Sequence, residues 1–404
     1  MTYPSVSHVS CSLTRAEFEA QRLSAGGWAH NDALVRNVLE GRYDAILPLH
    51  VELCATYRCN FSCPWCSCAL SRRTNGAAHD TLTAKELRAV LLRLAAHGIG
   101  VQWTGGEPLC NPALPEAAAP ASSLGMNQCL FTNGSLLGGE TADALLRTNL
   151  RFIRISLNTA DPDVHRRFHG LEHRALSEQT LRRFVEVCER KLRLGSRVRL
   201  GVSIVLDSTD VDAFPMTLDF LSRTARQAPG ALNYAVIRAV NEDFSGISFE
   251  KRSDFSQKYE AALAGESFRA LSGLDVELVL PNRGEPEFVP CTGCRGCSVF
   301  SELAPDGELF LCSDQYGNRD YAIGNLLEHT VEEIWGSERL RRTRRRAADC
   351  FASHRCPRYS RGWQFQTLFA EIEAHRARGE LDLVRAWIES LRRHIPDEGH
   401  SFYI

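Results

Sequence analysis

Between residues 46 and about 240, short apolar segments alternate with helical segments. The six apolar segments read LPLHVELC, IGVQWTG, NQCLFTN, RFIRISLN, RVRLGVSIVL and LNYAVIR. Strands that alternate with helices predict a parallel sheet, either curved as a partial barrel or open. One helix is well marked, because Thr83 and Glu86 form a capping box at its start and Gly98 follows its end. Active sites in such sheets lie at the C-terminal ends of the strands, which is where we look for functional groups.

The rest of the chain divides by composition. Residues 1–45 form an N-terminal extension with a short amphipathic helix around Leu34 to Leu39, and residues 46–240 form the α/β core. A helical connection over 241–290 ends in a short strand, VELVL. Residues 291–360 are rich in cysteine and turns, with a hairpin predicted at Pro305-Asp306-Gly307. Residues 361–404 are predicted to be a helical tail.

Charge and hydropathy exclude several classes of partner. The 404 residues carry 47 Lys and Arg against 49 Asp and Glu, so the net charge of −2 creates no field that recruits nucleic acid. The basic run from Arg339 to Arg346 lacks interleaved aromatic residues and is interpreted as a solvated helix face. No apolar run approaches the ~18 residues of a membrane-spanning helix, and no export signal is evident. We therefore expect a cytoplasmic protein without a membrane or nucleic-acid partner.

Fifteen cysteines are the informative excess in the composition. An odd number cannot pair completely, and a reducing compartment disfavours disulfides, so clustered cysteines indicate metal or redox chemistry. Three groups occur: Cys54 to Cys68, Cys291 to Cys312, and the pair Cys350 and Cys356. Cys129, on a predicted strand, and Cys188, on a predicted helix, are interpreted as core residues.

The first cysteine group contains a CxxxCxxC motif, formed by Cys59, Cys63 and Cys66, directly after the first strand. Thiolates favour iron–sulfur clusters or zinc. Three thiolates leave one iron of a four-iron cubane without a protein ligand, and that iron can bind a small molecule. Two alternatives stay open here: a structural zinc site completed by Cys54 or Cys68, and a cubane held by four cysteines.

Small polar residues and glycines follow the next three strands. Gly105 and Gly106 allow close backbone approach to a ligand, and Glu107 adds an acceptor at the same point. The segments Thr132-Asn133-Gly134 and Ser156-Leu157-Asn158 end the third and fourth strands. Together these segments are predicted to line one pocket. A structural zinc ribbon does not need such a pocket.

Four segments between residues 46 and 240 resemble the radical SAM superfamily in their order and separation. They read CNFSCPWC, TGGEPL, FTNG and RISLN. The resemblance implies a partial (β/α)6 barrel in which Cys59, Cys63 and Cys66 hold a [4Fe–4S] cluster whose open iron binds S-adenosylmethionine. It also implies roles for six further residues: Trp65 against the adenine, Gly105, Gly106 and Glu107 at the methionyl amino group, and Ser156 and Asn158 at the ribose or carboxylate.

The same resemblance implies the chemistry. An electron from the cluster, supplied by a flavodoxin- or ferredoxin-type donor, cleaves the sulfonium, and the resulting 5′-deoxyadenosyl radical abstracts a hydrogen atom from a substrate. One departure is visible in the segment His165-Arg-Arg-Phe-His169-Gly170. Relatives often have an arginine where this chain has His169, so Arg166 or Arg167 would have to take over any contact with the cofactor carboxylate.

The later cysteines suit one further cluster. Cys291-x5-Cys297-x9-Gly-x4-Cys312 places two thiolates on one stretch and a third across a hairpin, with Cys356 or Cys350 as the fourth ligand. Zinc is the alternative for Cys294-x2-Cys297 taken alone. The stretch is similar to the SPASM/Twitch extension of radical SAM enzymes, as is IGNLLEHTVEEIW, and a Twitch-like pattern would use Cys294 in place of Cys291. Ala347 and Ser360 stand where a second auxiliary cluster would need cysteines, so the resemblance implies one auxiliary cluster.

The combined evidence predicts a radical SAM oxidoreductase whose auxiliary cluster accepts the second electron of a dehydrogenation or cross-linking reaction. Its substrate is predicted to be a ribosomal peptide or a small biosynthetic molecule. The 45 N-terminal residues are short for a peptide-recognition domain, which favours a small molecule or a separately encoded recognition partner. Two alternatives are a redox-neutral epimerase in which Cys110 returns the hydrogen, and a zinc-binding scaffold without catalysis.

Overall fold

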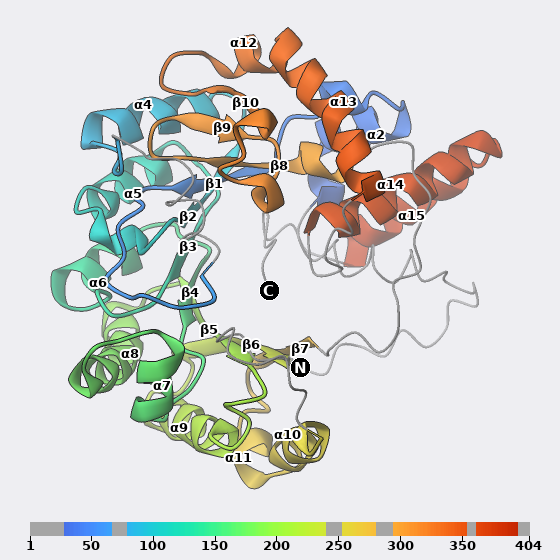
Figure 1. The fold of residues 1–404 in the computed structure, drawn as a ribbon. Coiled ribbons are helices and arrows are strands. Elements are labelled where there is room, and N and C mark those ends of the chain that lie inside the picture. The colour runs from blue at the N-terminus through green and yellow to red at the C-terminus, as the bar shows by residue number, and fades with distance from the viewer. Residues whose placement is uncertain (1–27, 67–78, 240–252, 280–293, 354–360, 395–404) are drawn as a thin grey trace.

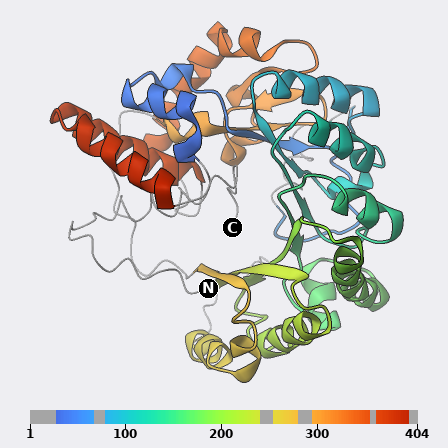
Figure 2. The same ribbon diagram turned by 180° about the vertical axis from the view of Figure 1, so that it is seen from behind.

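Strands from both halves of the chain lie in one curved sheet in the computed structural model, which describes residues 28–66, 79–239, 253–279, 294–353 and 361–394. The described strands have the order β10-β9-β8-β1-β2-β3-β4-β5-β6-β7. The sheet curves as an open arc with helices along its outer side, and the same arrangement is seen from behind (Figures 1 and 2).

The central part of the sheet is parallel, as the alternating pattern predicts. Its strands are β1 (His50–Cys54), β2 (Gly100–Thr104), β3 (Gln128–Thr132), β4 (Phe152–Ser156), β5 (Arg199–Leu206), β6 (Leu232–Ala239) and β7 (Asp275–Val279). The helices between them are α4 (Ala84–Ala95), α5 (Leu114–Ser123), α6 (Gly139–Leu146), α7 (Pro162–Phe168), α8 (Arg174–Leu194), α9 (Phe214–Gln227), α10 (Phe255–Leu263) and α11 (Glu266–Arg269), with the 3-10 turn η3 (Pro108–Cys110) after β2. The sequence predicted all seven strands, and the structure shows that the last of them, from VELVL, joins the parallel sheet beside β6.

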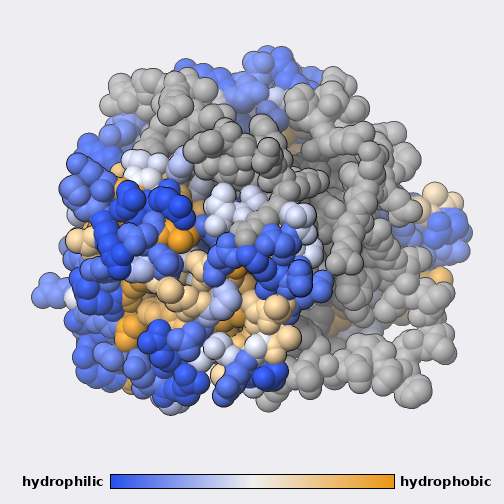
Figure 3. Space-filling view, turned by 60° about the horizontal axis from the view of Figure 1, so that its bottom comes forward, coloured by the Kyte–Doolittle hydropathy of each residue, from blue (hydrophilic) through white to orange (hydrophobic). Residues whose placement is uncertain are grey.

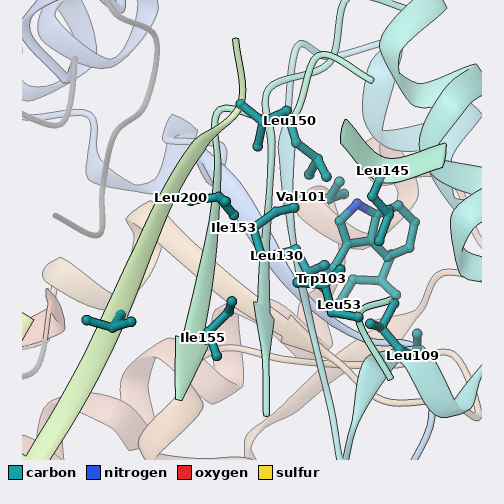
Figure 4. Packing of buried hydrophobic residues seen from close by; sticks show 14 of the residues in the cluster. Leu53, Val101, Trp103, Leu109, Leu130, Leu145, Leu150, Ile153, Ile155 and Leu200 are labelled. Atoms are coloured by element: carbon teal, nitrogen blue, oxygen red, sulfur yellow. The ribbon is translucent and has the colours of Figure 1, made fainter. Parts of the chain in front are cut away.

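The helix-covered face of the sheet holds the main core. Alternate residues of each strand point into it, among them Leu53, Val101, Leu130 and Ile153, all buried (Figure 4). The predicted capping box of α4 is present, since Thr83 and Glu86 exchange hydrogen bonds between side chain and backbone. A smaller cluster on the opposite, inner face contains Cys129, Phe152, Tyr234 and Val236.

The cysteine-rich segment continues this sheet. After the 3-10 turn η4 (Gly296–Val299), strand β8 (Phe300–Leu303) pairs in parallel with β1, and β9 (Glu308–Phe310) and β10 (Ala322–Asn325) follow in antiparallel pairing. The β8–β9 hairpin was predicted, but its attachment to β1 was not. Two short 3-10 turns, η5 (Ser313–Gln315) and η6 (Arg319–Tyr321), and helices α12 (Val331–Trp335) and α13 (Glu338–Ser353) complete the segment.

The two ends of the described chain pack together in a second core. The N-terminal elements are η1 (Trp28–His30), α2 (Asp32–Leu39) and η2 (Tyr43–Ala45), and the C-terminal elements are α14 (Arg361–Ala377) and α15 (Leu381–His394). Trp28 and Val38 from the first group and Phe365 and Phe369 from the second are fully buried in one cluster. The predicted N-terminal helix and helical tail are therefore partners in packing.

The basic run of α13 faces solvent as predicted except at Arg344, whose side chain is only 12% exposed. In the basic run of α13, Arg339, Arg341, Arg344, Arg345 and Arg346 all form ion pairs with acidic side chains. Hydrophilic side chains cover much of the described surface in Figure 3, with apolar residues gathered between them. Within the described ranges, no helix has the length and apolar character needed to cross a membrane.

The second core offers a stability test. Phe369 is 0% exposed and its ring centroid lies 5.5 Å from that of Tyr43 and 5.7 Å from that of Phe365. We expect Phe369→Ala to lower the free energy of unfolding by about 3–5 kcal/mol, through lost burial and the cavity left behind. Leu383→Ala, at a position 63% exposed, should change it by no more than about 0.5 kcal/mol. Denaturant unfolding of both variants measures this, and equal effects would contradict the packing described.

Candidate active site at the carboxyl ends of the strands

The CxxxCxxC motif lies in the loop that follows β1. Cys59, Cys63 and Cys66 are each partly exposed. The loop turns within the motif, because the Cys66 N–H donates to the Cys63 carbonyl at 3.3 Å, and the Phe61 N–H donates to Cys59 Sγ at 3.4 Å. Burial raises the pKa of Cys59 to about 11, and nearby Glu107 and Cys66 act in the same direction.

The loop rests directly on the glycine pair after β2. The Gly106 N–H donates to the Thr56 carbonyl and the Glu107 N–H donates to the Arg58 carbonyl, both at 2.8 Å. A Cβ on Gly106 would lie 2.3 Å from the Arg58 oxygen, and one on Gly105, where φ is +135°, would lie 2.5 Å from the Thr56 oxygen. The close approach that the glycines permit is therefore to the cysteine loop itself.

Glu107 joins the cysteine loop and β2 to the end of β3. Its carboxylate is 1% exposed and accepts hydrogen bonds from Thr132 Oγ1 and the Asn133 N–H, both at 2.7 Å, and from the Leu109 N–H at 3.1 Å. Burial raises the pKa of Glu107 to about 7, and these three donors oppose the rise. The predicted contact of Glu107 with the methionyl amino group stays a prediction.

Asn60, between the first two cysteines, ties the loop to the third rim segment. Its Nδ2 donates to Ser135 Oγ at 2.8 Å, and its Oδ1 accepts from Asn133 Nδ2 at 3.0 Å. Ser135 in turn donates to Asn133 Oδ1 at 2.6 Å, which closes the network. Sequence analysis did not single out Asn60, although its position inside the motif was the available signal.

His169, at the end of α7, contacts a cysteine of the motif. Its Nδ1 lies 3.3 Å from Cys63 Sγ, and its Nε2 lies 3.2 Å from Asn158 Nδ2. The Asn158 Oδ1 accepts from the Val205 N–H at 2.9 Å, which fixes the amide so that its N–H group faces His169. The imidazole therefore accepts at Nε2 and donates from Nδ1 to the Cys63 sulfur.

The position that departs from the family pattern is thus a partner of a cysteine. His169 is 1% exposed, and burial lowers its pKa well below the ordinary value, with neighbouring His165 acting in the same direction. The backbone around it also holds the loop, since Ser62 N–H donates to the His169 carbonyl at 3.1 Å. A Cβ on Gly170, where φ is +58°, would lie 2.2 Å from the Ser62 oxygen.

Asn158 is bound within the protein at both ends of its amide. It has φ of +56°, a left-handed conformation that asparagine tolerates better than most residues, and is 3% exposed. Ser156, at the end of β4, pairs with Ser203 on β5 and is partly exposed. The predicted cofactor contacts of Ser156 and Asn158 stay predictions, and the amide of Asn158 is already committed to Val205 and His169.

Trp65 lies against α7 and not free in the pocket. Its Nε1 donates to the Phe168 carbonyl at 2.9 Å, and the two ring centroids are 4.9 Å apart. The ring is therefore fixed beside the third cysteine, and its contact with adenine stays a prediction. Arg166 is partly exposed and Arg167 exposed on the same helix.

Two further cysteines lie near the loop in different surroundings. Cys54 is fully buried beside Phe310, donates to the Thr56 carbonyl at 3.4 Å, and has its pKa raised to about 12 by burial. Cys110 ends η3, is partly exposed, and has its pKa raised by burial and by Glu107. Cys68, the other thiol considered for a zinc site, lies outside the described residues.

The later cysteines gather at the opposite end of the strands. Cys294 and Cys297 precede β8, while Cys312 follows β9, which runs antiparallel to β8, so all three lie at one end of the hairpin. Because β8 is parallel to β1 and Cys59 follows β1, the two cysteine groups are separated by a strand length, on the order of 15 Å. Cys291 and Cys356 lie outside the described residues, and for Cys350 only the position in the last turn of α13 is described.

The donor set in the loop after β1 fits an iron–sulfur cluster. Three thiols in one loop, with the Phe61 N–H and His169 Nδ1 within hydrogen-bond distance of two of the sulfurs, provide the soft ligands and the hydrogen bonds to sulfur that such clusters use. Among the residues that the structure describes, no three His, Cys, Asp or Glu side chains form a group suited to a single metal ion.

Comparison with known proteins identifies both regions. Residues 53–221 match the radical SAM superfamily, and residues 294–357 match an iron–sulfur cluster-binding domain, SPASM. The chain is 27% identical over 285 residues to a PqqA peptide cyclase of Gluconobacter oxydans, covering 69% of this chain and 74% of that one. It is 25% identical over 305 residues to the PqqA peptide cyclase of Xanthomonas axonopodis pv. citri, covering 72% and 74%.

A solved structure has the same fold. SuiB of Streptococcus suis, in a crystal structure with the precursor peptide SuiA, aligns with a TM-score of 0.54 at 14% identity, over 82% of this chain and 74% of that one. The cysteine loop, the glycine pair beneath it and the second cysteine group thus occur in the regions that the two families match. The chain belongs to the radical SAM superfamily and is a radical SAM enzyme with a SPASM iron–sulfur cluster-binding domain.

Proposed function

We propose that this radical SAM enzyme oxidises a peptide by two electrons, as a dehydrogenation or a cross-link. The observation that carries this proposal is the similarity to PqqA peptide cyclases, which extends over about three quarters of each relative and so reaches beyond the radical SAM region. It favours a peptide over the small molecule that the short N-terminal segment suggested. In this proposal a separately encoded partner is able to recognise the peptide.

The residues around the cysteine loop would hold the cofactors. Cys59, Cys63 and Cys66 would ligate the [4Fe–4S] cluster, and Gly105, Gly106, Glu107, Ser156, Asn158 and Trp65 are the proposed contacts of S-adenosylmethionine. When bound, this pair supplies reductive cleavage of the sulfonium and a 5′-deoxyadenosyl radical. The protein's part is to fix the loop through Asn60, Glu107 and His169 and to exclude water from the inner face of the sheet.

The two electrons of the oxidation go to two acceptors. The substrate loses one hydrogen atom, which leaves in 5′-deoxyadenosine, and then a proton and an electron as the new bond forms. The SPASM domain is the proposed acceptor of that electron. Because its family match begins at residue 294, we favour Cys294, Cys297 and Cys312 with Cys356 or Cys350 over the set that begins with Cys291. An external flavodoxin- or ferredoxin-type protein would supply the first electron.

One observation favours a second candidate, redox-neutral epimerisation. The Cys110 thiol lies close enough to the cysteine loop to interact with Arg58 and the Asn60 N–H, and burial and Glu107 raise its pKa. A protonated thiol beside the active site is the group that could return a hydrogen atom to a substrate radical. The zinc scaffold has no comparable support.

Oxidation and epimerisation differ in product mass. We expect reconstituted enzyme, given S-adenosylmethionine, a reductant and any short peptide found to be encoded beside its gene, to yield a product lighter by two hydrogen atoms. Cys110→Ala should leave this product unchanged. Mass spectrometry in deuterated water tests both points, because a product of unchanged composition that gains solvent deuterium, and that disappears in Cys110→Ala, would establish the epimerase instead.

Iron content tests the ligand assignment. Alanine at Cys59, Cys63 or Cys66 should each remove one cluster, about four iron atoms per chain, and abolish 5′-deoxyadenosine formation. Cys188→Ala, which changes a buried core thiol on α8, should retain full iron content. The assignment fails if a motif variant keeps all its iron, or if anaerobically purified enzyme contains zinc in place of iron.

The hydrogen bond from His169 predicts a shift in reduction potential. An N–H donor to a ligating sulfur stabilises the more negative, reduced cluster, so His169→Ala should lower the midpoint potential by on the order of 50 mV. His97→Ala is the control, since His97 pairs with Glu332 at 3.0 Å and precedes β2, at the opposite end of the sheet from the cysteine loop. Potentiometric titration followed by EPR measures the midpoint, and equal potentials in both variants would show that His169 does not act on the cluster.

A further inference from the structure

The inner face of the sheet carries two arginines on either side of one tyrosine ring. Arg154 on β4 and Arg199 on β5 have guanidinium carbons 5.7 Å and 5.5 Å from the ring centroid of Tyr234 on β6. Both arginines therefore share the same aromatic neighbour on the inner face of the sheet, opposite the face that the helices cover.

Strand register brings Arg154 and Tyr234 to one level of the sheet. Arg154 pairs with Gly201, and Gly201 pairs with Tyr234. A Cβ at Gly201 would lie 2.2 Å from Tyr234 Cζ, so the missing side chain is what lets the ring lie across β5 toward Arg154. On the other side, the Phe131 ring centroid lies 4.8 Å from the guanidinium carbon.

The two arginines differ in their partners. Arg199 is ion-paired with Asp275 on β7. Arg154 is 8% exposed, and its Nε and Nη2 are buried without a hydrogen-bond partner in the described part of the chain. The Tyr234 hydroxyl, fully buried beside it, interacts with the Arg154 guanidinium and has no other hydrogen-bond partner in the described part of the chain. Contact with aromatic rings compensates only part of the cost of burying an unpaired charge.

We infer that Arg154 and Tyr234 bind a carboxylate group of the substrate. Two guanidinium N–H groups and a phenol O–H are the donors that the two oxygens of a carboxylate accept. The inference rests on the proposed function, because it names a group that the peptide must present, such as an acidic side chain or a C-terminus.

The position of the site separates it from the cofactor's own carboxylate. Arg154 lies two residues before Ser156 on β4, and is therefore one level deeper in the sheet than the rim where the cofactor contacts are proposed. A ligand that reaches Arg154 has to extend past that rim along the inner face. The carboxylate of S-adenosylmethionine is the other possible source, and the experiment distinguishes the two.

The test compares two probes on the reconstituted full-length enzyme with S-adenosylmethionine bound. N-acetylglutamate amide should bind at least about tenfold more tightly than the neutral N-acetylglutamine amide in isothermal titration calorimetry. Arg154→Met should reduce this preference to about twofold or less, and Tyr234→Phe should weaken binding of the acidic probe about threefold. Arg199→Met, which alters the paired arginine over the same ring, should retain the preference.

Three results would overturn the inference. One is equal binding of both probes to the wild-type enzyme, and another is loss of S-adenosylmethionine affinity in Arg154→Met, which would assign the site to the cofactor. The third is a fall of several degrees in the melting temperature of Arg154→Met, because removing an unpaired buried charge should leave it unchanged or raise it. The binding assay needs no turnover, so failure of the carboxylate site and failure of the radical chemistry are read separately.

Discussion

The active site depends on a backbone contact that excludes side chains. The loop after β1 lies so close to the Gly105–Gly106 turn that a Cβ on either glycine would overlap a carbonyl oxygen of the loop. Two backbone hydrogen bonds of 2.8 Å join the segments, and Glu107 extends the contact to β3. With Gly170 packed on Ser62 from the other side, the three cysteines are held between elements from distant parts of the chain. The position of the loop is therefore fixed by contacts within the protein itself.

The sequence predicts well where the strands lie along the chain, but it predicts poorly which strands lie beside one another. Strands β1 to β6 could be located because each is an apolar run that ends at a small polar segment. The pairing of β8 with β1 could not, since alternation shows which face of a strand is buried but not which strand lies beside it. Its consequence is large, because it makes the cysteine-rich segment part of the main sheet and places the two cysteine groups at opposite ends of adjacent strands.

Some residues of the site could also be predicted from the sequence, and others could not. The cysteine motif and the glycine pair can be found from the sequence, because their chemistry needs particular residues at fixed separations. His169 could be recognised only as a departure from the family pattern, since 106 residues separate it from Cys63 and only the fold joins them. Arg154 and Tyr234 gave no signal at all. They look like ordinary strand residues, and their significance lies in Nε and Nη2 of Arg154, which the described residues do not satisfy.

The central claim is that Cys59, Cys63 and Cys66 hold a cluster that binds S-adenosylmethionine directly. EPR of the reduced Cys294→Ala/Cys297→Ala variant tests it most directly, because the auxiliary signal is then removed. The account predicts a [4Fe–4S]+ spectrum whose g values change when S-adenosylmethionine is added. A spectrum that does not respond to S-adenosylmethionine, or the absence of any cluster signal in a variant that is fully folded, would contradict it.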